Sequence, residues 1–219
     1  MSASKNSQVK TLNTPMLFTY SHPNSVISDQ FRAIRANLHF LTKEKTCKLI
    51  LITSPETGEG KSTTAANLAV SMAQQEGKIL LIDANLRDPA IQDIFNVPNN
   101  EGLIDILKTE GSFERAVHQT RIENLDILTS GSSLSHFVEL LGTNTMQNLL
   151  TKLSAFYDAI LIDSSSLLTS PETRVLSAYC DGVILTLKRD KTTVKKIEET
   201  KKVLDIAGAK LVGVVMHEK

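Results

Sequence analysis

The chain has 219 residues, of which 41% are hydrophobic, a length and composition that suit one domain with a substantial core. Twenty-four basic residues balance 24 acidic ones, so no overall charge draws the protein to nucleic acid or to a lipid surface. The two cysteines, Cys47 and Cys180, lack metal-ligand spacing, so we expect neither a disulfide framework nor a zinc site, and a reducing cytoplasm fits best. No apolar run approaches the roughly 18 to 20 residues that a membrane span needs, so any membrane connection must come through a partner.

The chain begins with a polar segment, residues 1–20, that shows no clear periodicity and is predicted to be extended or disordered. The remainder, residues 21–219, is predicted to form a single domain. It opens with an extra N-terminal helix, because apolar residues recur there at helical spacing. This stripe consists of Ile27, Phe31, Ile34, Leu38 and Leu41.

Short runs rich in Ile, Leu and Val alternate with segments of helical period through the rest of the chain. The runs are continuously apolar, as in strands buried on both faces, and they cover residues 48–53, 78–83, 125–130, 158–163, 182–187 and 210–215. The helical segments cover residues 61–76, 101–119 in two pieces, 143–156, 171–179 and 192–207. This alternation predicts an α/β fold, with a mainly parallel sheet covered by helices on both faces.

The clearest motif is "SPETGEGKST", which follows the first predicted strand and opens a helix. It matches the phosphate-loop pattern at Gly60, Lys61 and Ser62, with Pro55 in the place of the leading glycine. Glycines let backbone N–H groups close on phosphate, the lysine reaches the β and γ oxygens, and the hydroxyl can ligate Mg²⁺. A plain glycine turn is the alternative, but strand, loop and helix occur together in the required order. The predicted nucleotide-binding residues are Gly58, Glu59, Gly60, Lys61, Ser62 and Thr63.

Acidic residues end two of the predicted strands, at the edge of a parallel sheet where ligands bind. Asp163 has the form of a Walker B acid that holds Mg²⁺ through water, although it could instead cap a turn with the serines that follow it. Asp83 is followed four residues later by Arg87. The two could form an ordinary turn, with Asp83 as its cap and Arg87 in solvent. Beside a phosphate loop, Asp83 is more simply a base or a Mg²⁺ ligand, so the predicted metal ligands are Ser62, Asp83 and Asp163.

Together these stretches resemble the cytoplasmic kinase module of bacterial tyrosine kinases, the BY-kinases of capsule and exopolysaccharide synthesis. The resemblance runs from about Ser25 to His217 and is carried by "SDQFRAIRANLHF", "TSPETGEGKST", "LLIDANLRDP", "NNEGLIDIL", "IENLDILTSG" and "DAILID". It implies a P-loop protein-tyrosine kinase that uses ATP and Mg²⁺. The residues to which it assigns catalysis are Lys61, Asp83, Arg87 and Asp163.

The resemblance also implies partners. Members usually pair with a transmembrane activator, a polysaccharide co-polymerase, phosphorylate protein tyrosines, and assemble into a homo-oligomeric ring, so this cytoplasmic chain would be recruited to the inner face of the membrane. The family's ring motif corresponds to Asp29, Arg32 and Arg35, whose spacing places them on one side of a helix. The alternative is a solvated helix face. The basic stretch 188–202 is interrupted by acids, so we expect it to face water and predict no nucleic-acid partner.

Several positions depart from the family pattern. Asn85 replaces a second acid after the second strand, "DSSS" stands at 163–166 in place of Asp-Thr-Pro-Pro, and Glu172 replaces an aspartate. A proline-rich turn is replaced by "SSLSHF" at 132–137. The family's C-terminal tyrosine cluster is absent, and the sequence holds only Tyr20, Tyr157 and Tyr179, so autophosphorylation of the usual kind is not expected.

Three functions therefore stay open. The first is a kinase that phosphorylates tyrosines of another protein, with Asp83 as base. The second is an ATP-binding regulatory module of the polysaccharide assembly machinery with weakened catalysis. The third is a partitioning-type ATPase; such proteins carry a signature lysine at the position of Glu56, and an acid there cannot clamp phosphate.

Overall fold

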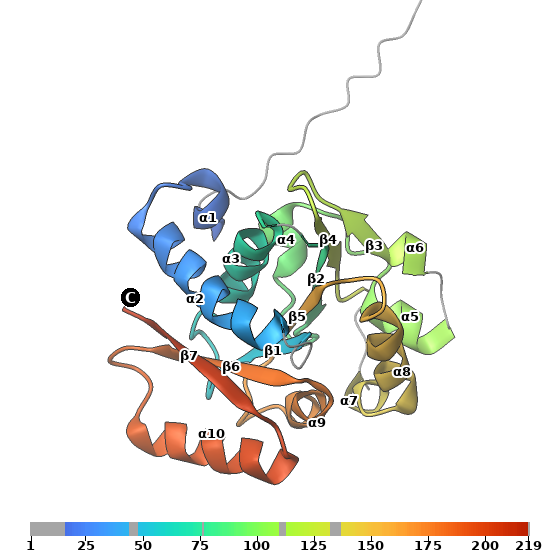
Figure 1. Ribbon diagram of the computed structural model, residues 1–219. Helices are drawn as coiled ribbons and strands as arrows, with labels where there is room; N and C mark the ends of the chain where they lie inside the picture. Colours follow the sequence, from blue (N-terminus) through green and yellow to red (C-terminus); the bar gives the residue numbers. More distant parts are fainter. Residues whose placement is uncertain (1–15, 44–47, 76, 110–112, 132–136, 219) are drawn as a thin grey trace, which may run out of the picture.

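The computed structural model describes residues 16–218 except 44–47, 76, 110–112 and 132–136. Its centre is a seven-stranded sheet in the order β3-β4-β2-β5-β1-β6-β7 (Figure 1). The strands are β1 Leu49–Thr53, β2 Ile79–Ala84, β3 Val117–Gln119, β4 Leu125–Leu128, β5 Ala159–Ser164, β6 Gly182–Lys188 and β7 Leu211–His217. All pairings are parallel except that of β3 with β4. The predicted mainly parallel sheet is thus confirmed.

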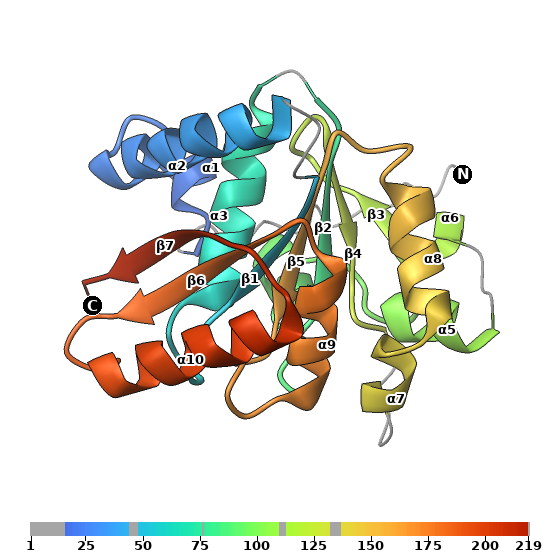
Figure 2. The same ribbon diagram turned by 60° about the horizontal axis from the view of Figure 1, so that its bottom comes forward.

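Helices cover both faces of this sheet (Figure 2). They are α1 Phe18–Ser21, α2 Val26–Lys43, α3 Lys61–Ala73, α4 Ile91–Phe95, α5 Leu103–Thr109, α6 Phe113–Ala116, α7 Phe137–Leu141, α8 Asn144–Leu153, α9 Pro171–Tyr179 and α10 Val194–Ala207. One hydrophobic cluster joins the sheet to α2, α3 and α4, and a second joins it to α5, α8, α9 and α10. No helix in the part of the chain described here is long and apolar enough to cross a membrane.

The central strands explain why the sheet forms and where its chemistry lies. Every residue of β2 and of β5 is buried, as expected of continuously apolar strands between two helical layers. Because β2 and β5 pair in parallel, their ends coincide, and Asp83 and Asp163 are directly opposite each other in the register. Asp83 and Asp163, which the sequence predicted at strand ends, are therefore neighbours at the carboxyl end of the two central strands.

The beginning of the chain differs in part from its prediction. Residues 1–15 lie outside the described residues, but Met16–Tyr20 are ordered, and expecting extended or disordered chain there was wrong. Leu17 is completely buried, and Thr19 bonds to Asn67 of α3 through both its backbone N–H and its hydroxyl, at 3.0 and 3.1 Å from Asn67 Oδ1. A polar composition concealed this contact because its acceptor lies 48 residues away.

Short elements account for the other differences. The two helical pieces predicted within 101–119 exist as α5 and α6, but Val117–Gln119 forms the edge strand β3, since it pairs antiparallel with β4. The sequence pattern also missed α4 and α7, which have five residues each and are too short to show a period. These errors leave the carboxyl edge of the sheet as predicted.

Candidate active site

The phosphate loop joins β1 to α3 and has a backbone that only glycine adopts readily. Gly58 and Gly60 have φ angles of 72° and 83°, in the left-handed region. At Gly60 a side chain is excluded a second time, because a Cβ there would lie 2.7 Å from Nε2 of His217. The loop lines a cavity of about 1110 Å³ together with α2, the end of β7 and the turns that follow β2 and β5. It can therefore present backbone N–H groups to a ligand in this cavity.

Lys61 is the first residue of α3 and is buried, with 7% of its surface exposed. Its ammonium donates to Oγ of Ser54 at 3.1 Å. Loss of solvent lowers the pKa of Lys61, while the charges of Asp163 and Glu59 act in the opposite direction. The positive charge of Lys61 thus lies at the loop, where the motif predicts that it contacts phosphate.

Asp163 is completely buried, and neither of its carboxylate oxygens has a hydrogen-bond partner within the described residues. Burial and the neighbouring charge of Asp83 raise its pKa well above the usual range, and the Ser62 hydroxyl and the Lys61 ammonium oppose this rise. Two buried acceptors without a well-formed protein hydrogen bond, beside the Ser62 hydroxyl, fit a group that binds a cation or a cation's water. Within the described residues no group of three His, Cys, Asp or Glu could hold a metal. Mg²⁺ would thus depend on Ser62, Asp163 and the nucleotide itself.

Asp83 is equally buried but fully bonded. Its Oδ1 accepts from the N–H of Asn85 at 3.0 Å, and its Oδ2 accepts from those of Ala90 and Ile91 at 3.1 and 3.0 Å. Burial raises the pKa of Asp83 to about 6, and these three N–H groups limit the rise. Asp83 therefore caps the turn after β2, as the first interpretation of this residue predicts. It also lies beside Asp163, as a base or a Mg²⁺ ligand would.

Asn85 bonds to another of the substituted positions. Its Oδ1 accepts from the hydroxyl of Ser165 at 2.7 Å, and its Nδ2 donates to the carbonyl of Asp88 at 2.6 Å. The side chain is buried, with 7% of its surface exposed. The amide supplies both an acceptor and a donor here, and a carboxylate would supply only acceptors. Asn85 thus links the turn after β2 to the turn after β5.

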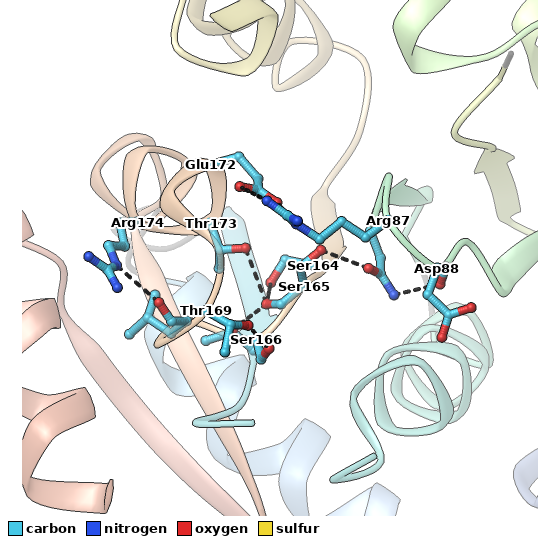
Figure 3. Close-up of polar contacts among 12 residues, drawn as sticks. Arg87, Asp88, Ser164, Ser165, Ser166, Thr169, Glu172, Thr173 and Arg174 are labelled. Carbon is cyan, nitrogen blue, oxygen red and sulfur yellow. Dashed lines mark hydrogen bonds and ion pairs between the residues drawn. The ribbon is translucent and has the colours of Figure 1, made fainter. Parts of the chain in front are cut away.

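Arg87 joins the turn after β2 to helix α9 through a second departure from the family pattern. Its guanidinium donates from Nε and Nη2 to the two carboxylate oxygens of Glu172, at 2.6 and 3.3 Å (Figure 3). Glu172 is at the start of α9 and its side chain is 1% exposed, whereas that of Arg87 is 48% exposed. The predicted catalytic arginine therefore serves at least as the partner of a buried acid.

His217, at the end of β7, is a site residue that the sequence did not reveal. Its Nε2 lies 2.8 Å from Oγ1 of Thr64, and it borders the cavity beside Gly60. Burial, and then the charge of Lys188, lowers its pKa. The two bonded residues are 153 positions apart and carry no shared motif, so only the fold brings them together.

The three predicted interface residues lie on α2, and two of them are already bonded to each other. Arg32 Nη2 lies 2.5 Å from Oδ1 of Asp29, one turn away. Arg35 instead donates to the carbonyl of Ser71 on α3, at 2.5 Å. Asp29 and Arg32 thus form an exposed ion pair, while Arg35 forms a hydrogen bond that connects α2 to α3.

Comparison with known proteins agrees with this geometry. The AAA domain family matches residues 47–209. Tyrosine-protein kinase YwqD of Bacillus subtilis is 38% identical over 199 residues, which are 91% of this chain and 84% of that protein. The crystal structure of the chimerical protein CapA2B2 superposes with a TM-score of 0.87 at 35% identity, over 94% of this chain and 90% of that one. The kinase domain of Escherichia coli tyrosine kinase ETK gives 0.90 at 25% identity, over 98% and 84%. The chain therefore belongs to the bacterial tyrosine-protein kinase family and has its P-loop fold.

Proposed function

We propose that this protein is an ATP-dependent protein-tyrosine kinase that transfers the γ-phosphate of ATP to tyrosines of other proteins. The observation that carries the proposal is the buried, unbonded carboxylate of Asp163 at the edge of the sheet, next to the phosphate loop. A buried acid without well-formed hydrogen bonds costs stability, and such groups cluster at functional sites. Its neighbours, the buried Lys61 ammonium and the Ser62 hydroxyl, are the groups that phosphoryl transfer requires.

In this proposal the chain works by positioning and by neutralising charge. Backbone N–H groups at Gly58 and Gly60 bind phosphate oxygens, and Lys61 compensates negative charge on them. Ser62 and Asp163 would hold Mg²⁺, which when bound would offset further phosphate charge. Phosphoryl transfer has a loose transition state, so orientation of the tyrosine hydroxyl matters more than a strong base.

Asp83 is the proposed base for the tyrosine hydroxyl. A pKa of about 6 leaves its carboxylate mainly ionised at neutral pH and still able to accept a proton. The three backbone N–H groups favour that ionised form, and they fix the position of the carboxylate beside Asp163. Asp83 therefore has a positioning role in the turn in addition to the proposed chemical one.

The substrates are proposed to be tyrosines of other proteins, because two of the three in this sequence are engaged. Tyr157 is 3% exposed and donates its hydroxyl to Asp126 at 2.8 Å, and Tyr179 donates to the carbonyl of Gly142. Tyr20 is 43% exposed. Resemblance to the family supports a role in capsular or exopolysaccharide synthesis, with a transmembrane activator at the inner membrane face and a ring built through α2.

The test is phosphotyrosine formation by the purified chain. Protein, Mg²⁺ and labelled ATP are incubated with a random Glu–Tyr copolymer, with and without the cytoplasmic segment of a candidate activator. We expect label on tyrosine that depends on Mg²⁺ and is lost in Lys61→Ala. Equal labelling by wild type and Lys61→Ala, or no labelling in either, would overturn the kinase proposal.

A second candidate, an ATP-binding regulatory module with weakened transfer, is favoured by Asn85. Its amide cannot take up a proton, and its bonds to Ser165 and Asp88 hold the turn closed. This candidate predicts that wild type binds ATP as tightly as Asp83→Asn and labels no copolymer. Loss of polysaccharide together with loss of phosphotyrosine in cells that carry Asp83→Asn, with ATP affinity equal to wild type, would favour the kinase instead.

A further inference from the structure

The turn that connects β6 to α10 reaches across to the phosphate loop. Lys191, in this turn, donates from Nζ to the carbonyl oxygen of Thr57 at 2.5 Å. The same nitrogen lies 3.0 Å from the position that a Cβ on Gly58 would take. The ammonium thus contacts the backbone of the loop, while the residue remains exposed, as predicted for this basic stretch.

The acidic residues of the loop are already paired with other groups. Glu56 forms an ion pair with Lys196, in the first turn of α10. Glu59 is completely buried, and its carboxylate accepts from the N–H of Glu56 at 2.7 Å and from the hydroxyl of Thr192. Two acids beside the phosphate site are therefore held by the segment 191–196 and by the loop's own backbone.

Lys191 differs from these groups because its contact on the loop is a neutral carbonyl. Within the described residues it forms no ion pair with a carboxylate, and its side chain is exposed. An ammonium has three N–H donors, and the Thr57 carbonyl uses one of them. The stem of a lysine is flexible and its charge is compact, which suits it to follow a phosphate group. A full positive charge is thus available above the loop at residues 57 and 58.

We propose that Lys191 is a second phosphate-binding cation of the nucleotide site, supplied by the same chain. Partitioning ATPases place such a charge at the loop position that Glu56 occupies here, and Lys191 lies over the two residues that follow it. The proposal rests on the proposed function only in requiring that the site binds ATP. Because ATP carries more negative charge than ADP, Lys191 strengthens ATP binding more than ADP binding.

The test compares ATP and ADP affinities by isothermal titration calorimetry in the presence of Mg²⁺. Lys191→Met removes the charge and keeps the stem, and Lys191→Arg keeps the charge. Lys195→Met is the matched control, since it removes the same charge from an exposed position on α10. We expect Lys191→Met to weaken ATP binding about tenfold, ADP binding less than threefold, and the control to match wild type. Lys191→Arg should retain most of the affinity.

Two results would overturn the proposal. Unchanged ATP affinity in Lys191→Met excludes a phosphate contact. If Lys191→Met weakens ATP and ADP binding equally and also lowers the melting temperature, then Lys191 only stabilises the loop through its hydrogen bond to the Thr57 carbonyl. Salt gives an independent readout, because the ATP affinity of wild type should fall more steeply with ionic strength than that of Lys191→Met.

The outcome is distinguishable from that of the kinase proposal. If ATP binding depends on Lys191 but no tyrosine is labelled, the kinase proposal fails and the second cation stands. If tyrosine is labelled and Lys191→Met binds ATP like wild type, the reverse holds.

Discussion

Two regions meet at the carboxyl edge of the sheet, and they differ in how their polar groups are used. In the phosphate-loop region, the buried Asp163 carboxylate has no hydrogen-bond partner among the described residues. In the turn after β2, Asp83, Asn85 and Arg87 are all bonded to backbone or to the turn and helix that follow β5. Both regions line the cavity, but only the first contains a buried carboxylate without a well-formed hydrogen bond, whereas the polar groups of the second bond to one another and to backbone. The departures from the family pattern fall mainly in the second region.

This difference teaches that binding and transfer are separable in this chain. The loop, Lys61 and Asp163 keep the groups that hold nucleotide and Mg²⁺. In the second region the substituted residues bond to each other or to residues that the motif retains, as Asn85 does with Ser165 and Arg87 with Glu172. Such pairs stabilise the turns whether or not phosphate is transferred.

The strongest way to break the first region is to substitute Gly60 by alanine. A Cβ there meets the His217 ring at 2.7 Å and the φ angle is 83°, so the ring must move and the loop backbone is strained. We expect ATP affinity to fall by more than about 100-fold, measured by calorimetry. The matched control is Gly208→Ala, at a similar φ of 68° but with nothing within 4 Å of the added Cβ. It should lose about 1 kcal/mol of stability and no affinity. Similar affinities in the two variants would contradict the packing argument.

The two buried acids offer a direct comparison, because they share a sheet edge and differ in their partners. Asp83→Asn places an NH₂ group among the three N–H donors that the carboxylate accepts, so we expect a loss of about 2 kcal/mol of stability at pH 7. Asp163→Asn replaces a buried acid whose pKa is raised by burial and by the charge of Asp83, so the ligand-free chain should be unchanged or more stable by about 1 to 2 kcal/mol. Urea unfolding measures both.

The pH dependence of Asp163→Asn follows from the direction of the pKa shift. The pKa of Asp163 is raised in the folded chain, so the unfolded chain ionises first and wild-type stability falls as pH rises above about 4. The gain from Asp163→Asn should therefore be largest at pH 7 and vanish near pH 4. A gain that is constant with pH, or a loss of stability at pH 7, would show that Asp163 has donors in solution.

Much of this site could be predicted from sequence because its chemistry is local. The glycines, Lys61 and Ser62 are contiguous, and Asp83 and Asp163 each end an apolar run, so a parallel sheet brings them together. The partners could not be predicted in the same way. Asn85 and Ser165 are 80 residues apart, Lys191 and Thr57 are 134 apart, and His217 and Thr64 are 153 apart. These pairs depend on how turns from different strands pack, which neither propensity nor periodicity encodes.

Substitution of Arg87 tests how much its ion pair with Glu172 stabilises the contact between the turn after β2 and helix α9. Arg87→Ala leaves Glu172, whose side chain is 1% exposed, without its guanidinium. We expect a loss of about 1 to 2 kcal/mol, less than for a fully buried pair because Arg87 is half exposed. Arg189→Ala is the control, since its partner Glu218 is exposed and 3.7 Å away, and it should change stability by less than about 0.5 kcal/mol. Equal losses in the two variants would show that burial of Glu172 is unimportant.

Asn85→Asp gives the smallest effect on stability and the sharpest one on function. Ser165 can still donate to the new carboxylate, but the contact with the Asp88 carbonyl changes from a donor to an acceptor. We therefore expect a loss of about 1 kcal/mol in urea unfolding and little change in ATP affinity. If the missing second acid limits transfer, tyrosine labelling of the copolymer should rise several-fold. Ser165→Ala is the control, because it breaks the same link between turns without adding an acid. Equal labelling by wild type, Asn85→Asp and Ser165→Ala would mean that the amide does not limit transfer, and that Asn85 serves only to hold the two turns together.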